Sequence, residues 1–178
     1  GRMNSPVFPT VTLKIATSLD GRIATASGES QWITCAESRA EVHRLRAAHD
    51  AVLVGAETAL KDNPRLTART DPPPNRQPMR IVADSSLRTP LESHLVTTAR
   101  EVSTVLAVGL DVEEERERPY LAMGVQVWAL PIAPMGGLSV RGLMSYCADE
   151  GIGSILLEGG GRLAASFLKA GMVDVIEW

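Results

Sequence analysis

The chain has 178 residues, of which 44% are hydrophobic and 22% charged, and its formal net charge is −3. This length supports one domain with a substantial core, and the composition is ordinary for a soluble globular protein. The slightly negative charge gives no indication of a nucleic-acid partner. No apolar run approaches the length of a membrane span. The two widely separated cysteines, without metal-ligand spacing, are typical of a cytoplasmic protein.

Short runs of apolar and β-branched residues predict the strands of a sheet. Residues 51–55 (AVLVG) form a continuous apolar run, which is typical of a strand buried on both faces. Further strands are expected at residues 10–16, 79–83, 102–108, 125–130, 154–158 and 173–178.

Capping residues and helical spacing predict helices between these strands. Thr34 and Glu37 form a T-x-x-E capping box that opens a helix running to about His49. Other helices are expected at residues 57–61, at 111–123 with Asp111 as N-cap, from 140 to Gly151, and from the glycines at 159–161 to Gly171. Loops are expected at residues 18–30 and at the proline-rich stretch 63–78.

Strands alternate with helices throughout, so the sequence predicts an α/β fold with three layers, α/β/α, around a mostly parallel central sheet. We see no internal repeat or linker, and we expect a single domain over residues 1–178. Residues 1–9 are expected to be a flexible start. The chain stops at Trp178 inside an apparent strand, so the C-terminal strand region is expected to be incomplete.

Three adjacent glycines, Gly159, Gly160 and Gly161, separate a strand from a helix near the end of the chain. Glycines there let the backbone approach a ligand closely, and the helix N-terminus offers free N–H groups to a phosphate. A tight strand–helix turn without a ligand explains the same residues. The run is not the G-x-G-x-x-G motif of dinucleotide-binding domains, so both interpretations stay open at this point.

Other polar residues gather in three stretches, residues 14–32, 55–69 and 84–88. The first reads equally as a surface loop with a buried tryptophan, and the second as a helix stopped by Asp-Asn-Pro. The third, DSSLR, follows a strand, where α/β sheets bind ligands, and its two serines and arginine suit an additional phosphate.

The sequence offers no convincing nucleophile–base pair. Cys35 and Cys147 have no metal-ligand spacing around them, so we expect reduced thiols and no metal. Hydride transfer remains compatible with this composition, because a nicotinamide cofactor carries the difficult chemistry itself.

Four segments together resemble the reductase domain of the bacterial bifunctional riboflavin-biosynthesis pyrimidine deaminase/reductase. They are VTLKIATSLDGRIATASGESQWIT, LRAAHDAVLVGAETALKDNPRLTAR, RQPMRIVADSSLRTP and ILLEGGGRLAASFLKAGMVD. The resemblance implies a dihydrofolate-reductase-like fold, NADPH as cofactor, and reduction of the ribose of 5-amino-6-(5-phosphoribosylamino)uracil to an open ribityl chain.

The resemblance also implies site residues. The positions that match NADPH contacts are Ala16, Trp32, Thr58, Asp62, Ser85, Gly160, Gly161, Arg162, Leu163, Ala164, Ala165 and Ser166. The positions that match substrate contacts are Ser30, Arg46, Leu66, Arg69 and Glu158. Glu158 is our first candidate for catalytic proton transfer because it ends a strand directly before the glycine turn, and Asp62 is its rival.

The match has two departures. The family often has a proline in the turn where this chain has Gly160-Gly161-Arg162, and the zinc signature of the deaminase half is missing. The missing signature implies that deaminase activity comes from another domain or protein. The resemblance implies a small phosphorylated substrate and, together with the open final strand, a homodimer. Two alternatives stay open: a reductase of the same fold acting on a pterin or another carbonyl compound, which would not need Ser30, Arg46 and Arg69 together, and a non-catalytic nucleotide-binding module.

Overall fold

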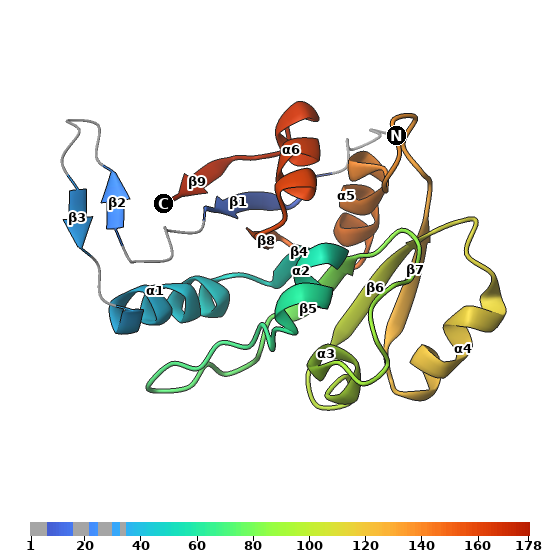
Figure 1. Ribbon diagram of the computed structural model, residues 1–178, viewed down its shortest axis with the longest axis horizontal. Coiled ribbons are helices and arrows are strands. Elements are labelled where there is room, and N and C mark those ends of the chain that lie inside the picture. The colour runs from blue at the N-terminus through green and yellow to red at the C-terminus, as the bar shows by residue number, and fades with distance from the viewer. Residues whose placement is uncertain (1–6, 16–21, 25–29, 33–34) are drawn as a thin grey trace, which may run out of the picture.

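The structure, a computed structural model, describes residues 7–15, 22–24, 30–32 and 35–178, with only the backbone described at 22–24, 30–32 and Cys35. Within these residues the chain builds one large sheet with helices on both faces (Figure 1). The three-layer α/β prediction is therefore confirmed.

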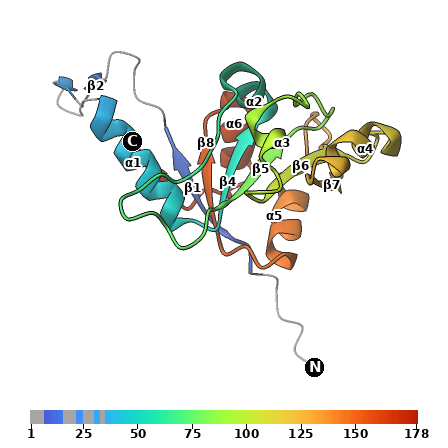
Figure 2. The same ribbon diagram turned by 90° about the horizontal axis from the view of Figure 1, so that it is seen from below.

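The large sheet has seven strands in the order β7-β6-β5-β4-β8-β1-β9, and every pairing between them is parallel. The order from β7 to β1 can be followed across Figure 2. The strands are β1 (Thr10–Lys14), β4 (Ala51–Gly55), β5 (Met79–Ala83), β6 (Thr104–Gly109), β7 (Gln126–Leu130), β8 (Ser154–Glu158) and β9 (Val175–Glu177). Most are fully buried at their centres, as continuous apolar runs predict for a parallel sheet.

Helices cover the two faces unequally. They are α1 (Cys35–Ala48), α2 (Ala56–Asp62), α3 (His94–Thr97), α4 (Glu114–Ala122), α5 (Val140–Asp149) and α6 (Gly161–Lys169). Helices α5 and α6 share one core cluster with alternate strand residues such as Leu53 and Ile81, and α2, α3 and α4 share the other with Val52 and Val82. Figure 1 shows α5 and α6 together on one side and α3 on the other.

Helix α1 lies over the face that carries α2. His49, which directly follows it, contacts the Thr12 hydroxyl through Nε2 at 3.2 Å. Thr12 is level with Leu156, which is level with Val52 in the neighbouring strand, and residues in register point to the same face. Helix α1 therefore brings its side chains toward the carboxyl end of β8.

Three details differ from the sequence predictions. Residues 22–24 and 30–32 form an antiparallel pair, β2 (Arg22–Ala24) and β3 (Ser30–Trp32); β2 lies inside the stretch predicted as loop, and β3 begins at its last residue. Strands of three residues are too short to show a period. Helix α4 is capped at Glu113, so Asp111 is not its N-cap. Helix α3 was not predicted because one turn shows no helical period, although Ser93 caps it by accepting a hydrogen bond from Val96 N.

Arg80, in β5, is an unexpected core residue that is only 1% exposed. Its Nη1 donates to Arg65 O, and its Nη2 lies within hydrogen-bonding distance of two carbonyls and two hydroxyls, those of Leu95, Val102, Thr98 and Thr104. Burial lowers the pKa of Arg80 to about 10. This side chain ties the loop after α2 to the segment around α3.

In the described part of the chain, none of the helices has the length and apolar character needed to cross a membrane.

Candidate active site

The candidate site lies at the carboxyl ends of β4 and β8, which are neighbours in the sheet. After β4 the chain continues to β5 on one side, and after β8 it continues through α6 to β9 on the other. The strand order reverses direction between β4 and β8, and ligands of open α/β sheets bind at such a switch point. The first turn of α2 and the glycine turn both lie there.

The glycine turn is built for a special backbone path. Gly159 and Gly160 have φ values of +61° and +80°, in the region that favours glycine. A Cβ on Gly159 would lie 3.2 Å from the Thr58 hydroxyl, and a Cβ on Gly160 would lie 3.7 Å from Gly55 N. Thr58 and the glycine turn, both predicted cofactor contacts, are thus packed together.

Gly161 has a different environment. It begins α6, its φ is not in the left-handed region, and a Cβ there would meet no described atom within 4 Å. Packing within the described residues therefore does not require a glycine here. The helix also starts without a side-chain cap, because its N-cap residue is Gly160. The missing side chain at Gly161 leaves room for the pyrophosphate of a dinucleotide beside the uncapped N–H groups of the helix.

The remaining predicted contacts on α6 divide into two groups. Leu163 and Ala164 pack against the core, so their side chains face the sheet. Arg162, Ala165 and Ser166 are exposed, and the Ser166 hydroxyl donates to Arg162 O at 2.9 Å.

Arg46 and Glu158, both predicted substrate contacts, form an ion pair with each other. Arg46 Nε donates to one carboxylate oxygen at 2.8 Å and Nη2 to the other at 2.9 Å, while Nη1 donates to Thr67 O at 3.1 Å. The side chains are 13% and 14% exposed. Arginine has five N–H donors, so two remain for a ligand. The pair ends β8 directly before the glycine turn.

The loop after α2 brings a second arginine to the same region. Arg69 N donates to His43 Nδ1 at 3.0 Å, and its guanidinium donates to the Thr67 hydroxyl at 2.6 Å. Burial, together with the charges of Arg69 and Arg46, lowers the pKa of His43, so this imidazole favours its neutral form. Leu66 is buried beneath the loop with a φ of +55°.

Asp62, the rival proton-transfer candidate, is the last residue of α2 and is exposed. The next residue, Asn63, ends the helix in a left-handed conformation, and its side-chain oxygen accepts a hydrogen bond from His94 N.

The turn after β5 contains the predicted contact Ser85. Asp84 is fully buried and accepts hydrogen bonds from Arg88 N, Thr89 N and the Thr89 hydroxyl. Its carboxylate is occupied by the turn and is not presented to a ribose. Ser85 is half-buried, and the side chains of Ser86 and Arg88 are exposed.

The structure thus unites Arg46 with Glu158, and Thr58 with the glycine turn, while Ser85 follows the strand next to β4. Ala16 lies outside the described residues, and Ser30 and Trp32 are described only as backbone. Sequence reasoning did not identify His43 and Thr67 as site residues. No motif of the sequence marks either one.

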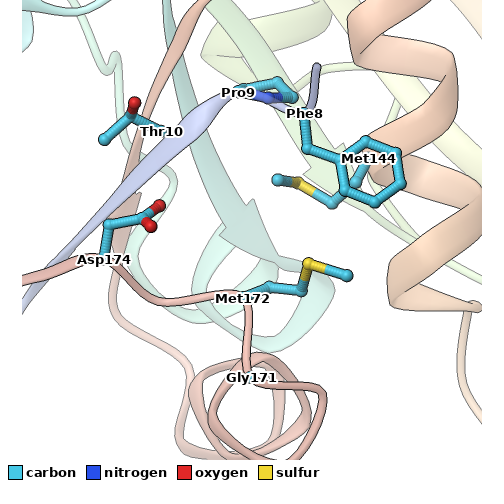
Figure 3. Close-up of a pocket in the computed structure, with 7 residues that line it drawn as sticks. All are labelled: Phe8, Pro9, Thr10, Met144, Gly171, Met172 and Asp174. Carbon is cyan, nitrogen blue, oxygen red and sulfur yellow. The ribbon is translucent and has the colours of Figure 1, made fainter. Parts of the chain in front are cut away.

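The described surface also has hollows, one beside the candidate site and one away from it. One, of about 290 Å³, is lined by Arg65, Thr67, Arg69, Arg80, His94, Thr98, Glu101 and Val102, and so adjoins the loop of Arg69. The other, of about 230 Å³, lies at the amino-terminal end of β1 (Figure 3). There Met144, Met172 and Phe8 form an apolar wall, and Asp174 accepts a hydrogen bond from Val11 N. Within the described residues, no group of three or more His, Cys, Asp or Glu is arranged to hold a metal ion.

This chain is similar to known proteins over nearly its whole length. The family model described as RibD C-terminal domain matches residues 9–177. The riboflavin biosynthesis protein RibD of Actinobacillus pleuropneumoniae is 42% identical over 166 residues, which cover 93% of this chain and 43% of that protein. RibD of Aquifex aeolicus is 38% identical over 168 residues, covering 94% of this chain and 45% of the relative. The chain therefore spans less than half the length of these relatives.

Solved structures show the same fold. RibD of Acinetobacter baumannii superposes with a TM-score of 0.69 at 30% identity, covering 95% of this chain and 44% of that one. A deaminase/5-amino-6-(5-phosphoribosylamino)uracil reductase of Thermotoga maritima gives a TM-score of 0.66 at 32% identity, covering 95% and 43%. With the family model matching nearly its whole length, this chain belongs to the RibD C-terminal domain family.

Proposed function

We propose that this chain is an NADPH-dependent oxidoreductase that reduces the ribose of 5-amino-6-(5-phosphoribosylamino)uracil to the ribitylamino product in riboflavin biosynthesis. The observation that carries the proposal is the uncapped glycine turn at the switch point, directly beside the Arg46–Glu158 ion pair. In our proposal this turn binds the phosphates of the cofactor, and the neighbouring charged pair contacts a polar substrate. Membership of the family and the printed activity of the Thermotoga maritima protein support the same reaction.

The bound cofactor would supply the hydride. In our proposal Gly160, Gly161 and the first turn of α6 hold its pyrophosphate, because the helix begins without a side-chain cap and the space beside Gly161 is open. Thr58, packed against Gly159, fixes the position of that turn. Ser85 contacts the adenosine half from the carboxyl end of β5.

The substrate phosphate is assigned to Arg69, with support from Arg46. Arg69 is exposed, and its single charge-assisted contact with Thr67 leaves further donors for a phosphate. Arg46 already donates three hydrogen bonds, two to Glu158 and one to Thr67, so it contributes fewer. Both arginines meet at Thr67, which makes one continuous basic edge beside the cofactor turn.

We propose that Glu158 lies at the junction of substrate and cofactor. Opening the ribose ring moves a proton to the ring oxygen, and a carboxylate beside the reacting carbon can relay it or orient the sugar. The Arg46 guanidinium donates to both carboxylate oxygens, so it sets the orientation of Glu158. Asp62 remains the alternative proton-transfer residue at the end of α2.

The proposal is tested by following NADPH oxidation with the phosphorylated ribosylaminouracil and with its unphosphorylated analogue. We expect oxidation with the first, formation of the ribitylamino product by mass spectrometry, and much weaker activity with the second. Replacing Arg69 with Ala should raise KM for the phosphorylated substrate and leave NADPH affinity nearly unchanged. Equal activity toward both substrates would refute the phosphate assignment, and absence of oxidation would refute the activity.

We further propose that the protein works as a homodimer in the cytoplasm and that deaminase activity comes from another domain or protein. The edge strand β9 exposes Val175 and Ile176, and Trp178 beyond it is also exposed, which supports a covered edge in the assembled protein. Sedimentation equilibrium at micromolar concentrations tests the assembly, and a monomer would contradict it.

A further inference from the structure

The turn after β5 carries a feature that sequence reasoning did not anticipate, which is an arginine from a distant helix. Arg116, on α4, donates from Nη2 to Ser86 O at 3.0 Å and to Leu87 O at 3.1 Å. Its side chain reaches the turn from a position about 30 residues later in the chain. The guanidinium therefore lies against the segment that contains the predicted cofactor contact Ser85.

The turn itself is rigid. Buried Asp84 binds the two backbone N–H groups that close it, Leu87 adopts a φ of +57°, and Ser85 O accepts a hydrogen bond from Gly109 N. Next to Arg116 on the same helix face, Tyr120 donates its hydroxyl hydrogen to Thr89 O. The backbone around Ser86 is thus held from inside by Asp84 and from outside by α4.

The charges presented by the turn are positive. The one carboxylate in its sequence, Asp84, is fully buried, while Ser86, Arg88 and Arg116 are exposed. Arg116 uses one nitrogen for the two carbonyls, and no hydrogen bond of its other two nitrogens is formed with the described residues. A phosphate beside Ser86 could therefore receive charge-assisted hydrogen bonds from Arg116 without loss of the turn.

The acidic residues in and before α4 indicate that a phosphate would bind through direct contact with Arg116 and not through a positive potential of the whole helix. Asp111, Glu113, Glu114, Glu115 and Glu117 surround Arg116 in the sequence, so the helix as a whole repels an anion. Arg118 is equally exposed but lies on another face of the helix, away from the turn. Only an arginine in contact with the turn can favour a phosphate in these surroundings.

We infer that Arg116, together with Arg88 and Ser86, recognises the 2′-phosphate of the adenosine ribose and so makes this site selective for NADPH over NADH. The inference rests on the proposed function for the position of the cofactor, since it takes the pyrophosphate to lie at the glycine turn and the adenosine half to extend over β5. It adds a specificity residue that lies outside the motifs of the sequence.

The test compares the binding of two probes that differ only in the 2′-phosphate, 2′,5′-ADP and 5′-AMP, by titration calorimetry. The variants are Arg116→Gln, which can still donate to the turn carbonyls, Arg116→Lys, which keeps the charge, and the matched control Arg118→Gln. We expect Arg116→Gln to weaken 2′,5′-ADP about tenfold to a hundredfold and to leave 5′-AMP almost unchanged. Arg116→Lys should restore part of the loss, and Arg118→Gln should bind both probes like the unaltered protein.

If Arg116→Gln weakens both probes equally, Arg116 only supports the turn and the inference is wrong. An unchanged affinity of Arg116→Gln for 2′,5′-ADP, or the same loss in Arg118→Gln, would also overturn it. So would an unaltered protein that binds 2′,5′-ADP no better than 5′-AMP. If the probes behave as expected but no substrate is reduced, the proposed activity fails while the Arg116 assignment stands. In an active enzyme, Arg116→Gln should lower kcat/KM for NADPH and spare that for NADH.

Discussion

The ion pair of Arg46 and Glu158 offers the most direct test of how this site handles protons. The Glu158→Gln substitution keeps the shape of the side chain but removes its charge, and it places an NH2 group against one guanidinium nitrogen. In place of the two charge-assisted hydrogen bonds of 2.8 and 2.9 Å, Arg46 would donate one hydrogen bond to the neutral amide oxygen and face the amide NH2 group with its other donor. Because the side chains are 13% and 14% exposed, we expect a loss of unfolding free energy of about 1–3 kcal/mol.

The effect on catalysis should exceed what this structural change explains. General acid–base help contributes about 10²–10⁴-fold, so kcat should fall at least tenfold while NADPH affinity changes much less. The matched control is Arg46→Met, which breaks the same ion pair but leaves the carboxylate in place. If Glu158 transfers a proton, kcat should be lower in Glu158→Gln than in Arg46→Met.

Steady-state kcat and KM, NADPH titration and urea unfolding of both single variants and the double variant provide the measurements. The unfolding data form a double-mutant cycle, in which we expect a coupling energy of about 1–2 kcal/mol between the two side chains. A Glu158→Gln protein that retains most of its kcat and only raises KM would show that Glu158 binds substrate without transferring a proton. A coupling energy near zero would refute the ion pair itself.

The remaining predictions concern the fold around the site. Gly159→Ala should lower the unfolding free energy by about 1–2 kcal/mol in thermal or urea unfolding, because the φ of Gly159 is +61°. Gly161→Ala should leave stability unchanged and weaken NADPH binding. Equal stability losses in the two variants would contradict the proposal that Gly161 is kept for the cofactor. Because the pKa of His43 is lowered in the folded protein, unfolding takes up a proton below about pH 6.5, and stability should fall as the pH decreases below that value. A His43→Asn variant should show a flatter dependence of unfolding free energy on pH. Identical pH dependences would exclude His43 as the cause. Arg80→Met should lower the unfolding free energy by at least about 3 kcal/mol, because it leaves buried carbonyls unpaired. The control Arg76→Ala, in the exposed ion pair with Asp50, should lower it by less than about 1 kcal/mol. Similar losses in the two variants would contradict a structural role for Arg80.

Local patterns were enough to predict the architecture. Strands β4 and β5 begin and end where their apolar runs do, and the alternation of strands with helices predicted a parallel sheet between two helical layers. Both inferences rest on interactions between residues close in sequence, which periodicity, glycines and caps report directly. The same patterns missed β2, β3 and α3, because elements of three or four residues show no period.

The sequence by itself determined that a glycine turn follows a buried strand, and the resemblance implied substrate roles for Arg46, Arg69 and Glu158, which remain a prediction. Only the tertiary structure decided how these side chains meet. Arg46 and Glu158 are 112 positions apart, and Arg116 reaches a turn about 30 positions before it. A local pattern cannot report such pairs, because their geometry depends on which strands become neighbours and which helix face packs over them. That arrangement is set by burying the apolar faces of the whole sheet, so the contacts of the charged side chains follow from the core.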